Sequence, residues 1–221
     1  MFSTNAVKFF LNQNIPENLP ENVSCLNPYQ SNEVREIVNR FFTKFYDDDN
    51  ERIFIVGINP GRFGGGITGI AFTDPINLER KCGIQNSFDK RHELSSRFVY
   101  NLINKFGGTE KFYKKFFITA LFPLALIKDE KNFNYYDSKK IYGTLKPHIL
   151  KTFNDQINFG ASNKIAISFG KKNAEYLKEI NNEIGFFDSI IYFDHPRFIM
   201  QYRSKKIPEY LENYSKILRN L

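Results

Sequence analysis

The stretch Arg52-Ile53-Phe54-Ile55-Val56-Gly57-Ile58-Asn59-Pro60-Gly61 decides the fold. Its first seven residues are mostly β-branched or aromatic, which is typical of a buried strand, and Asn-Pro-Gly then ends the strand. The loop from Asn59 to Phe72 contains five glycines. Glycine permits positive φ angles and lets a ligand approach backbone N–H groups closely. We therefore predict a buried strand that carries a functional loop at its carboxyl end.

Apolar runs and helical patterns alternate along the chain. Apolar residues at helical spacing predict a helix over 33–46, for which Ser31 is a suitable N-cap. Such alternation predicts an α/β fold, a three-layer sandwich with a central, mainly parallel four-stranded sheet flanked by helices. In such sheets, ligands bind at the carboxyl ends of the strands. The other predicted strands are 116–121, 164–168 and 189–193, and the other predicted helices are 91–106, 138–159, 171–183 and 207–221.

Length and composition predict one domain. A chain of 221 residues can bury a core without metal or disulfide support, so we expect a single domain over 1–221, with an N-terminal helix and an extended arm up to about residue 30. Cys25 and Cys82 lie far apart and indicate neither a zinc site nor a disulfide framework. No apolar run approaches the length of a membrane span. We expect a cytoplasmic monomer that needs no cofactor and no metal.

The glycine-rich loop has three interpretations on the residues alone. It can be a flexible turn, a phosphate cradle, or part of a catalytic site. A phosphate cradle is disfavoured because the Lys-Ser/Thr pair of a P-loop is missing and the glycines do not fit GxGxxG followed by an acidic residue. The chain therefore gives little support for a nucleotide cofactor.

A second loop, Phe193-Asp194-His195-Pro196-Arg197-Phe198, follows the last predicted strand. In a parallel sheet His195 and Asn59 lie at the same edge. There a neutral or cationic imidazole can donate a hydrogen bond to an oxygen on which negative charge develops. A lone histidine after a strand is more often structural, so the pairing with Asn59 is what makes His195 a candidate.

These two loops resemble motifs of the uracil-DNA glycosylase superfamily. The run from Gly57 to Phe72 is similar to the first motif of its single-strand-selective monofunctional branch, and its Gly-Ile-Asn-Pro-Gly core is equally similar to the mismatch-specific branch. His195-Pro196 is similar to the start of the second motif in the single-strand-selective branch, where the mismatch-specific branch has Asn. The matching residues of the first motif are Gly57-Ile58-Asn59-Pro60-Gly61, Phe63-Gly64, Thr68-Gly69 and Phe72.

The resemblance implies a repair enzyme that flips a damaged base, uracil first among candidates, out of DNA and hydrolyses its bond to deoxyribose. Asn59 would hold the attacking water, and His195 would stabilise the departing base. Phe72 would stack on the base, and Gly61 would leave room for it. The base-binding residues implied by the resemblance are Gly57, Ile58, Gly61, Phe72 and Ala120.

Ala120 is a departure from the family pattern. The single-strand-selective branch has there an Asn that reads the edge of uracil, ahead of a Pro-Leu pair that this chain keeps as Pro123-Leu124. Backbone groups near Ala120 could replace the Asn, or Thr119 or Asn86 could do so, or the pocket is less selective. Hypoxanthine and xanthine are therefore expected as additional substrates.

The expected partner is DNA that contains uracil or another deaminated base. A net charge of +7 suits a polyanion without identifying one. After His195-Pro196, an apolar pair between basic residues suggests a wedge that enters the duplex beside phosphate anchors. The alternative is a solvated basic face with a buried Phe. The expected DNA-binding residues are Arg62, Arg197, Phe198, Ile199, Arg203 and Lys205.

Two other functions fit the same residues. One is a non-catalytic nucleic-acid-binding module that keeps the fold and the basic face. The absence of the family Asn at Ala120 is the feature that supports this alternative. The other is a hydrolase of free nucleosides or nucleotides. The first differs from a glycosylase in releasing no base from DNA, and the second differs in acting on free nucleosides.

Overall fold

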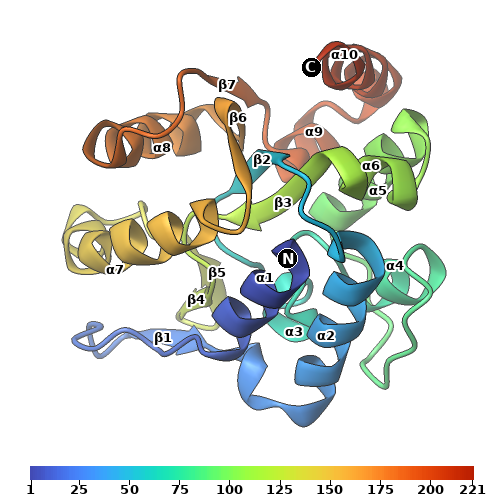
Figure 1. Cartoon of the computed structure of the whole chain (residues 1–221). Helices are drawn as coiled ribbons and strands as arrows, with labels where there is room; N and C mark the ends of the chain where they lie inside the picture. The colour runs from blue at the N-terminus through green and yellow to red at the C-terminus, as the bar shows by residue number, and fades with distance from the viewer.

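The central sheet of the computed structural model has four parallel strands in the order β3-β2-β6-β7 (Figure 1). The structure describes all residues, 1–221. The strands are β2 (Arg52–Gly57), β3 (Phe116–Ala120), β6 (Ala161–Phe169) and β7 (Ile190–Phe193). From β2 the chain passes to β3 on one side and then crosses to β6 on the other, so the strand order reverses at β2. Parallel sheets bind ligands at such a reversal, beyond the carboxyl ends of the strands.

Helices cover both faces of this sheet, as Figure 1 shows, so the predicted three-layer α/β sandwich is confirmed. One face packs against α1 (Phe2–Leu11), α2 (Asn32–Tyr46), α7 (Lys139–Ile157) and α8 (Lys171–Ile184). The other face packs against α5 (Leu94–Phe106), α6 (Thr109–Lys115) and α10 (Ile207–Asn220). Short helices interrupt the loops at the carboxyl edge and nearby: α3 (Gly65–Thr68), α4 (Pro75–Arg80) and α9 (Pro196–Tyr202).

Aromatic side chains fill the space between the sheet and both helical layers. On the α1 face, Phe2 makes edge contacts with Phe54 and Phe117, whose ring centroids lie 6.5 Å and 5.1 Å away. On the opposite face, Phe193 stacks on Tyr214 of α10 at 3.9 Å. Because aromatic residues bury large areas, these contacts contribute strongly to the hydrophobic stabilisation of the sheet.

The predicted extended arm before residue 31 is more structured than expected. Its strand β1 (Val23–Leu26) pairs antiparallel with β4 (Ala125–Lys128), which pairs in turn with β5 (Lys131–Phe133). The sequence did not reveal the β4–β5 hairpin because its turn residues, Asp129 and Glu130, lack the Asn-Gly or Gly signal of such turns. Both nevertheless adopt positive φ angles, 49° and 57°. This small sheet lies beside the carboxyl edge of β3 and contributes to the site described below.

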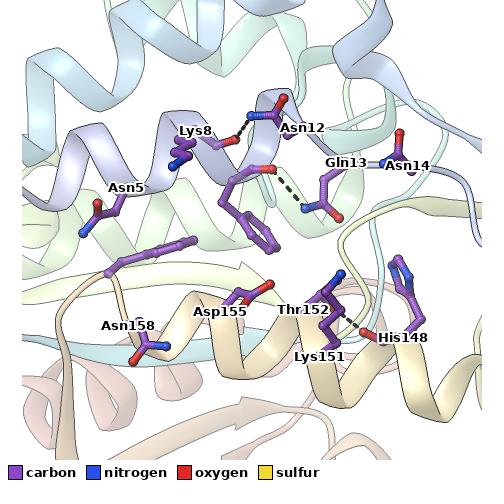
Figure 2. A pocket seen from close by; sticks show the side chains of 12 residues that line it. Asn5, Lys8, Asn12, Gln13, Asn14, His148, Lys151, Thr152, Asp155 and Asn158 are labelled. Atoms are coloured by element: carbon purple, nitrogen blue, oxygen red, sulfur yellow. Dashed lines mark hydrogen bonds between the residues drawn. The ribbon is translucent and has the colours of Figure 1, made fainter.

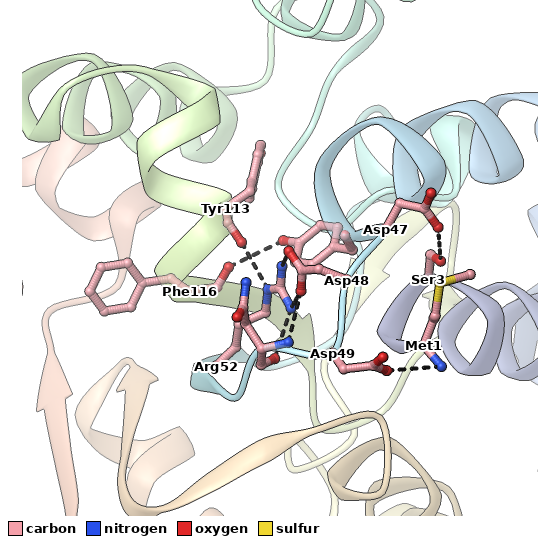
Figure 3. A network of polar contacts seen from close by, with 10 residues as sticks. Met1, Ser3, Asp47, Asp48, Asp49, Arg52, Tyr113 and Phe116 are labelled. Carbon is pink, nitrogen blue, oxygen red and sulfur yellow. Dashed lines mark hydrogen bonds and ion pairs between the residues drawn. The ribbon is translucent and has the colours of Figure 1, made fainter.

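An ion pair between buried Arg52 and partly exposed Asp48 holds the start of β2 (Figure 3). The side chain of Arg52 is fully buried and donates two hydrogen bonds to the carboxylate of Asp48, at 2.7 Å and 2.9 Å, and one to the Tyr113 carbonyl at 3.0 Å. Its guanidinium also lies 4.8 Å from the ring centroids of Phe2 and Tyr46. The bidentate geometry and the aromatic contacts compensate for the burial of the charge. The strand that carries the glycine-rich loop is thus anchored at its amino end.

None of the helices combines the length and the apolar character needed to cross a membrane.

Candidate active site

A cavity of about 500 Å³ opens at the carboxyl ends of β2 and β3, beside the loop that follows β7. Five residues singled out from the sequence line it together: Asn59, Gly61, Phe72, Ala120 and His195. They come from three segments that are far apart in the chain. The parallel sheet brings these segments to one edge. The prediction that Asn59 and His195 lie together, each in a loop after a strand, depended on this arrangement.

The side chain of Asn59 is held in place by the end of β5 and the residues that follow it. Its Nδ2 donates to the carbonyl of Phe133 at 3.0 Å, and its Oδ1 accepts from the backbone N–H of Tyr135 at 3.3 Å. These two hydrogen bonds fix the orientation of the side-chain amide. An amide oxygen has a second lone pair, so Oδ1 can still accept a hydrogen bond from a water molecule in the cavity.

His195 lies at the start of α9 with a defined tautomer. Its Nδ1 accepts a hydrogen bond from the backbone N–H of Arg197 at 3.2 Å, so the ring proton of the neutral form is on Nε2. Burial, and then the charge of Arg197, lower the pKa of His195 to about 4. At neutral pH the residue is therefore an uncharged imidazole whose Nε2–H is free to donate. Of the two charge states that the sequence left open, the structure favours the neutral one.

Phe72 adopts a backbone conformation that is rare for an aromatic residue. Its φ is 53°, in the left-handed region, where residues other than glycine are strained. The ring lies directly over Gly57: a Cβ atom at that position would be 2.7 Å from Cζ of Phe72. The ring centroid lies 6.1 Å from that of His195. Gly57 thus supports the aromatic ring, and the strained backbone turns this ring toward the cavity.

Ala120 lies in the cavity wall, but Thr119 and Asn86, the side chains considered as substitutes for its missing amide, do not. The hydroxyl of Thr119 is buried against the side chain of Gln156, and Asn86 donates to the carbonyl of Pro75 outside the cavity. The carbonyl of Ala120 accepts from Gln156 Nε2 at 3.4 Å. Neither Thr119 nor Asn86 can therefore replace the amide, and this part of the wall offers no free side-chain amide to a base.

The remaining polar groups of the cavity were not identified from the sequence. Glu93 precedes α5, and a Glu at the start of a helix is usually solvent-exposed, so it gave no signal. The residues from the unpredicted hairpin could not be placed without knowing that the hairpin exists. The additional cavity-lining polar residues are Glu93, Ser95, Asn132, Asn134, Tyr136, Gln201 and Tyr202.

Most of the predicted DNA-binding residues lie on one surface beside the cavity, but Ile199 does not. Its side chain is 0% exposed and packs in the core, so the expected apolar pair cannot form the wedge. Phe198 is exposed and pairs instead with Tyr202, which is 66% exposed, at a centroid distance of 5.6 Å. Arg203 covers the Phe198 ring at 5.2 Å, and Lys205 is exposed nearby in the chain.

Arg62 lies in the first-motif loop with its guanidinium over the ring of Phe63, 4.6 Å from the ring centroid. Its backbone N–H donates to Asn132 Oδ1 at 3.0 Å, which joins this loop to the hairpin. Of the two arginines, Arg197 lines the cavity, whereas Arg62 follows the lining residues Pro60 and Gly61 in the chain.

A family model described as the uracil DNA glycosylase superfamily matches residues 43–219. The chain belongs to the uracil-DNA glycosylase superfamily. Among solved structures, the crystal structure of wild-type SMUG2 from Pedobacter heparinus is 37% identical in sequence, with a TM-score of 0.95. The similarity covers 99% of this chain and 97% of that chain. No curated protein is significantly similar in sequence.

Membership in the superfamily supports a DNA glycosylase hydrolase that acts in DNA repair. The family match includes both loops singled out from the sequence, since residues 43–219 contain Asn59 and His195. The strained aromatic residue, the asparagine and the neutral histidine thus lie in one cavity of a uracil-DNA glycosylase fold.

A second cavity of this member of the uracil-DNA glycosylase superfamily, of about 510 Å³, lies between α1 and α7 (Figure 2). Amide and charged side chains line most of it, including Asn5, Lys8 and Asp155. Nε2 of His148 and Oε1 of Gln13 are buried without a hydrogen-bond partner. No residue of the two loops singled out from the sequence lines this cavity, so the cavity at the strand ends is the candidate active site.

Proposed function

We propose that this protein is a monofunctional DNA glycosylase that hydrolyses the N-glycosidic bond of uracil in DNA, and also that of hypoxanthine or xanthine. The observation that carries the proposal is the presence of Asn59, neutral His195 and strained Phe72 around one cavity. A base flipped out of the duplex would stack on Phe72. The proposed partner is therefore DNA with a deaminated base, and the protein acts on it as a monomer.

Each residue has a distinct part in the proposed reaction. The water oxygen bonds to C1′ of the deoxyribose while the bond from C1′ to the base nitrogen breaks, and the electron pair leaves with the base. Asn59 orients the water through Oδ1 but accepts no proton, so the proton passes to solvent. The Nε2–H of His195 donates to uracil O2, on which negative charge develops, and this hydrogen bond strengthens in the transition state.

The test is an oligonucleotide duplex and a single strand, each with one uracil, incubated with the purified protein in the presence of a metal chelator. We expect release of uracil and an intact abasic strand that breaks only after heating in alkali, because neither motif supplies a lysine nucleophile. Strand cleavage before alkali would contradict the monofunctional assignment. Binding without any base release would favour a non-catalytic module, and activity on free deoxyuridine alone would favour a nucleoside hydrolase.

The wall at Ala120 predicts a broad base range. Since no side-chain amide there selects the uracil edge, oligonucleotides with hypoxanthine or xanthine should be processed at measurable rates, and Ala120→Asn should shift the preference toward uracil. Single-turnover rates for the three bases, compared between the wild type and this variant, provide the measurement. Release of uracil alone by the wild type would mean that other groups select the base.

The exposed basic residues after His195 predict phosphate contacts. Arg203→Ala or Lys205→Ala should weaken DNA binding and reduce the slope of log K against log salt by about 1, while the rate at saturating enzyme stays nearly constant. Lys164→Ala is the matched control, because Lys164 is exposed near the amino end of β6, away from the cavity. The prediction fails if the control changes the salt dependence as much as the other two variants.

A further inference from the structure

Asn173, in the first turn of α8, is a buried side chain whose amide joins three distant segments of the chain. Its Nδ2 donates to the carbonyl of Val56 at 3.0 Å and to Oγ of Ser168 at 2.9 Å. Its Oδ1 accepts from the hydroxyl of Tyr135 at 2.8 Å. These partners belong to β2, to β6 and to the turn between β5 and α7. One amide thus connects the carboxyl ends of two strands to that turn.

The direction of each hydrogen bond follows from the carbonyl of Val56. A backbone carbonyl only accepts, so the NH2 end of the Asn173 amide faces Val56 and its oxygen faces the Tyr135 hydroxyl, which donates. Burial raises the pKa of Tyr135 far above its usual range, so the hydroxyl keeps its proton at neutral pH. The ring is fully buried and packs against Tyr136 and Tyr176, with centroids 5.1 Å and 5.6 Å away. The hydroxyl of Tyr135 is therefore held in one place.

Tyr135 is also the residue whose backbone N–H holds the side chain of Asn59. That N–H donates to Asn59 Oδ1 at 3.3 Å, and the carbonyl of Phe133 accepts from Asn59 Nδ2 at 3.0 Å. The other partner of Asn173, the carbonyl of Val56, lies three residues before Asn59 in the chain. Asn173 therefore restrains both the strand that carries Asn59 and the turn that orients its amide.

The orientation of Asn59 depends on this turn staying in place. At 3.3 Å, the hydrogen bond from the Tyr135 N–H is longer than the usual length of about 2.9–3.0 Å, so it is weak by itself. A weak bond directs the amide only if its donor does not move, and the hydroxyl of Tyr135 ties that donor to α8 through Asn173. A misplacement of about 1 Å in a reacting group can cost about a hundredfold in rate.

We propose that Tyr135 and Asn173 are positioning residues for Asn59, whose hydrogen bond holds the turn that directs Asn59 Oδ1 at the attacking water. This inference rests on the proposed function, in which that water attacks C1′. Neither Tyr135 nor Asn173 lines the cavity, so neither touches the base or the water. Their effect should fall on the chemical step, and equally on every base that is released, because the water is common to all of them.

The test is a double-mutant cycle of Tyr135→Phe with Asn59→Ala, read as the single-turnover rate of uracil release at saturating enzyme. Tyr135→Phe removes one hydroxyl, keeps the ring and leaves Asn173 Oδ1 without its donor. The rate should fall about tenfold when Asn59 is present, the scale of coupling between residues in one network. It should change less than about twofold when Asn59 is already alanine, because no amide is left to position. The enzyme concentration that gives half the maximal rate should stay constant.

Tyr46→Phe is the matched control. It removes the hydroxyl of another buried tyrosine, which donates to the carbonyl of Phe116 at 3.3 Å at the amino end of β3, the end of the sheet opposite the cavity. Its thermal midpoint should fall as that of Tyr135→Phe does, but its rate should equal that of the wild type. Equal rate losses in the two variants would refute the proposal, because the rate would then follow stability alone.

Asn173→Ala tests the other end of the hydrogen bond. It should slow uracil release at least as much as Tyr135→Phe, because it also removes the contact with Val56. Adding Tyr135→Phe to Asn173→Ala should slow the reaction no further, since both changes break the same hydrogen bond. A further tenfold loss in the combined variant would show that the Tyr135 hydroxyl acts by another route.

A second measurement does not depend on catalysis. The side-chain NH2 of Asn59 gives a pair of proton–nitrogen resonances, which are assigned by their absence from Asn59→Ala. In Tyr135→Phe this pair should shift and exchange faster with solvent, because the turn that orients the amide is released. In Tyr46→Phe it should stay as in the wild type. An unchanged pair in Tyr135→Phe would contradict the positioning role.

The possible failures are distinguishable. If the wild type releases no base, the proposed function fails, and the Asn59 resonances still show whether Tyr135 holds the amide. If the wild type releases uracil and Tyr135→Phe keeps its rate, the positioning role is refuted while uracil excision stands. The same conclusion follows if Tyr135→Phe loses the same factor with and without Asn59, or if its loss is confined to one base.

Discussion

Replacing His195 by alanine should lower the single-turnover rate of uracil release by about a hundredfold or more. The neutral imidazole presents Nε2–H to the cavity because Nδ1 already accepts from the backbone N–H of Arg197. A preorganised donor at the developing charge costs no reorganisation when the bond breaks, so its loss acts on the chemical step. Affinity for uracil-containing DNA should change much less, since phosphate contacts provide most of the binding.

His148→Ala is the matched control for this prediction. His148 lies in the separate cavity between α1 and α7, so its replacement should leave the rate of uracil release unchanged. A nearly wild-type rate for His195→Ala at saturating enzyme would refute the assignment, because another group would then stabilise the leaving base.

The same hydrogen bonding gives the pH dependence of uracil release. Since the pKa of His195 is about 4 and the neutral ring is the donor, the residue keeps one charge state from pH 6 to pH 9. The single-turnover rate should therefore show no titration by His195 in this range. A rise in rate as the pH falls through 6 would indicate that the imidazolium is the active form.

Replacing Asn59 by alanine should also lower the single-turnover rate about a hundredfold, for a different reason. The side chain both orients the water and joins the loop after β2 to the carbonyl of Phe133 and the N–H of Tyr135. Its loss removes the partner of two backbone groups as well as the water ligand. We therefore expect a lower thermal midpoint in addition to the slower chemical step, as measured by single-turnover kinetics and thermal unfolding.

Asn59→Asp should also be slower than the wild type, although a carboxylate can accept a proton from the water. An Asp oxygen in place of Nδ2 would face the carbonyl oxygen of Phe133, to which Asn59 now donates at 3.0 Å. Two acceptors at this distance repel, so the hairpin segment or the side chain must move. Asn86→Ala is the control, because Asn86 lies outside the cavity. A rate for Asn59→Asp at or above that of the wild type would show that this contact does not hold the site.

The layered fold follows from local patterns in the sequence. The run from Arg52 to Ile58 has the composition of a buried strand, and the helix over 32–46 shows its apolar face in the sequence. These signals are local because burial repeats with the period of the strand or helix itself. The β4–β5 hairpin escaped prediction because its residues carry positive φ at Asp129 and Glu130 without a turn signal.

The sequence by itself determined the alternation of strands and helices, the two motif loops, and the pairing of Asn59 with His195 at one sheet edge. Only the tertiary structure decided that Ile199 is buried, that His195 is neutral, and that Glu93 lies against Gly61 and Gly64. The physical reason is that burial and pKa depend on groups brought together from distant segments, and no local period of the sequence records those contacts.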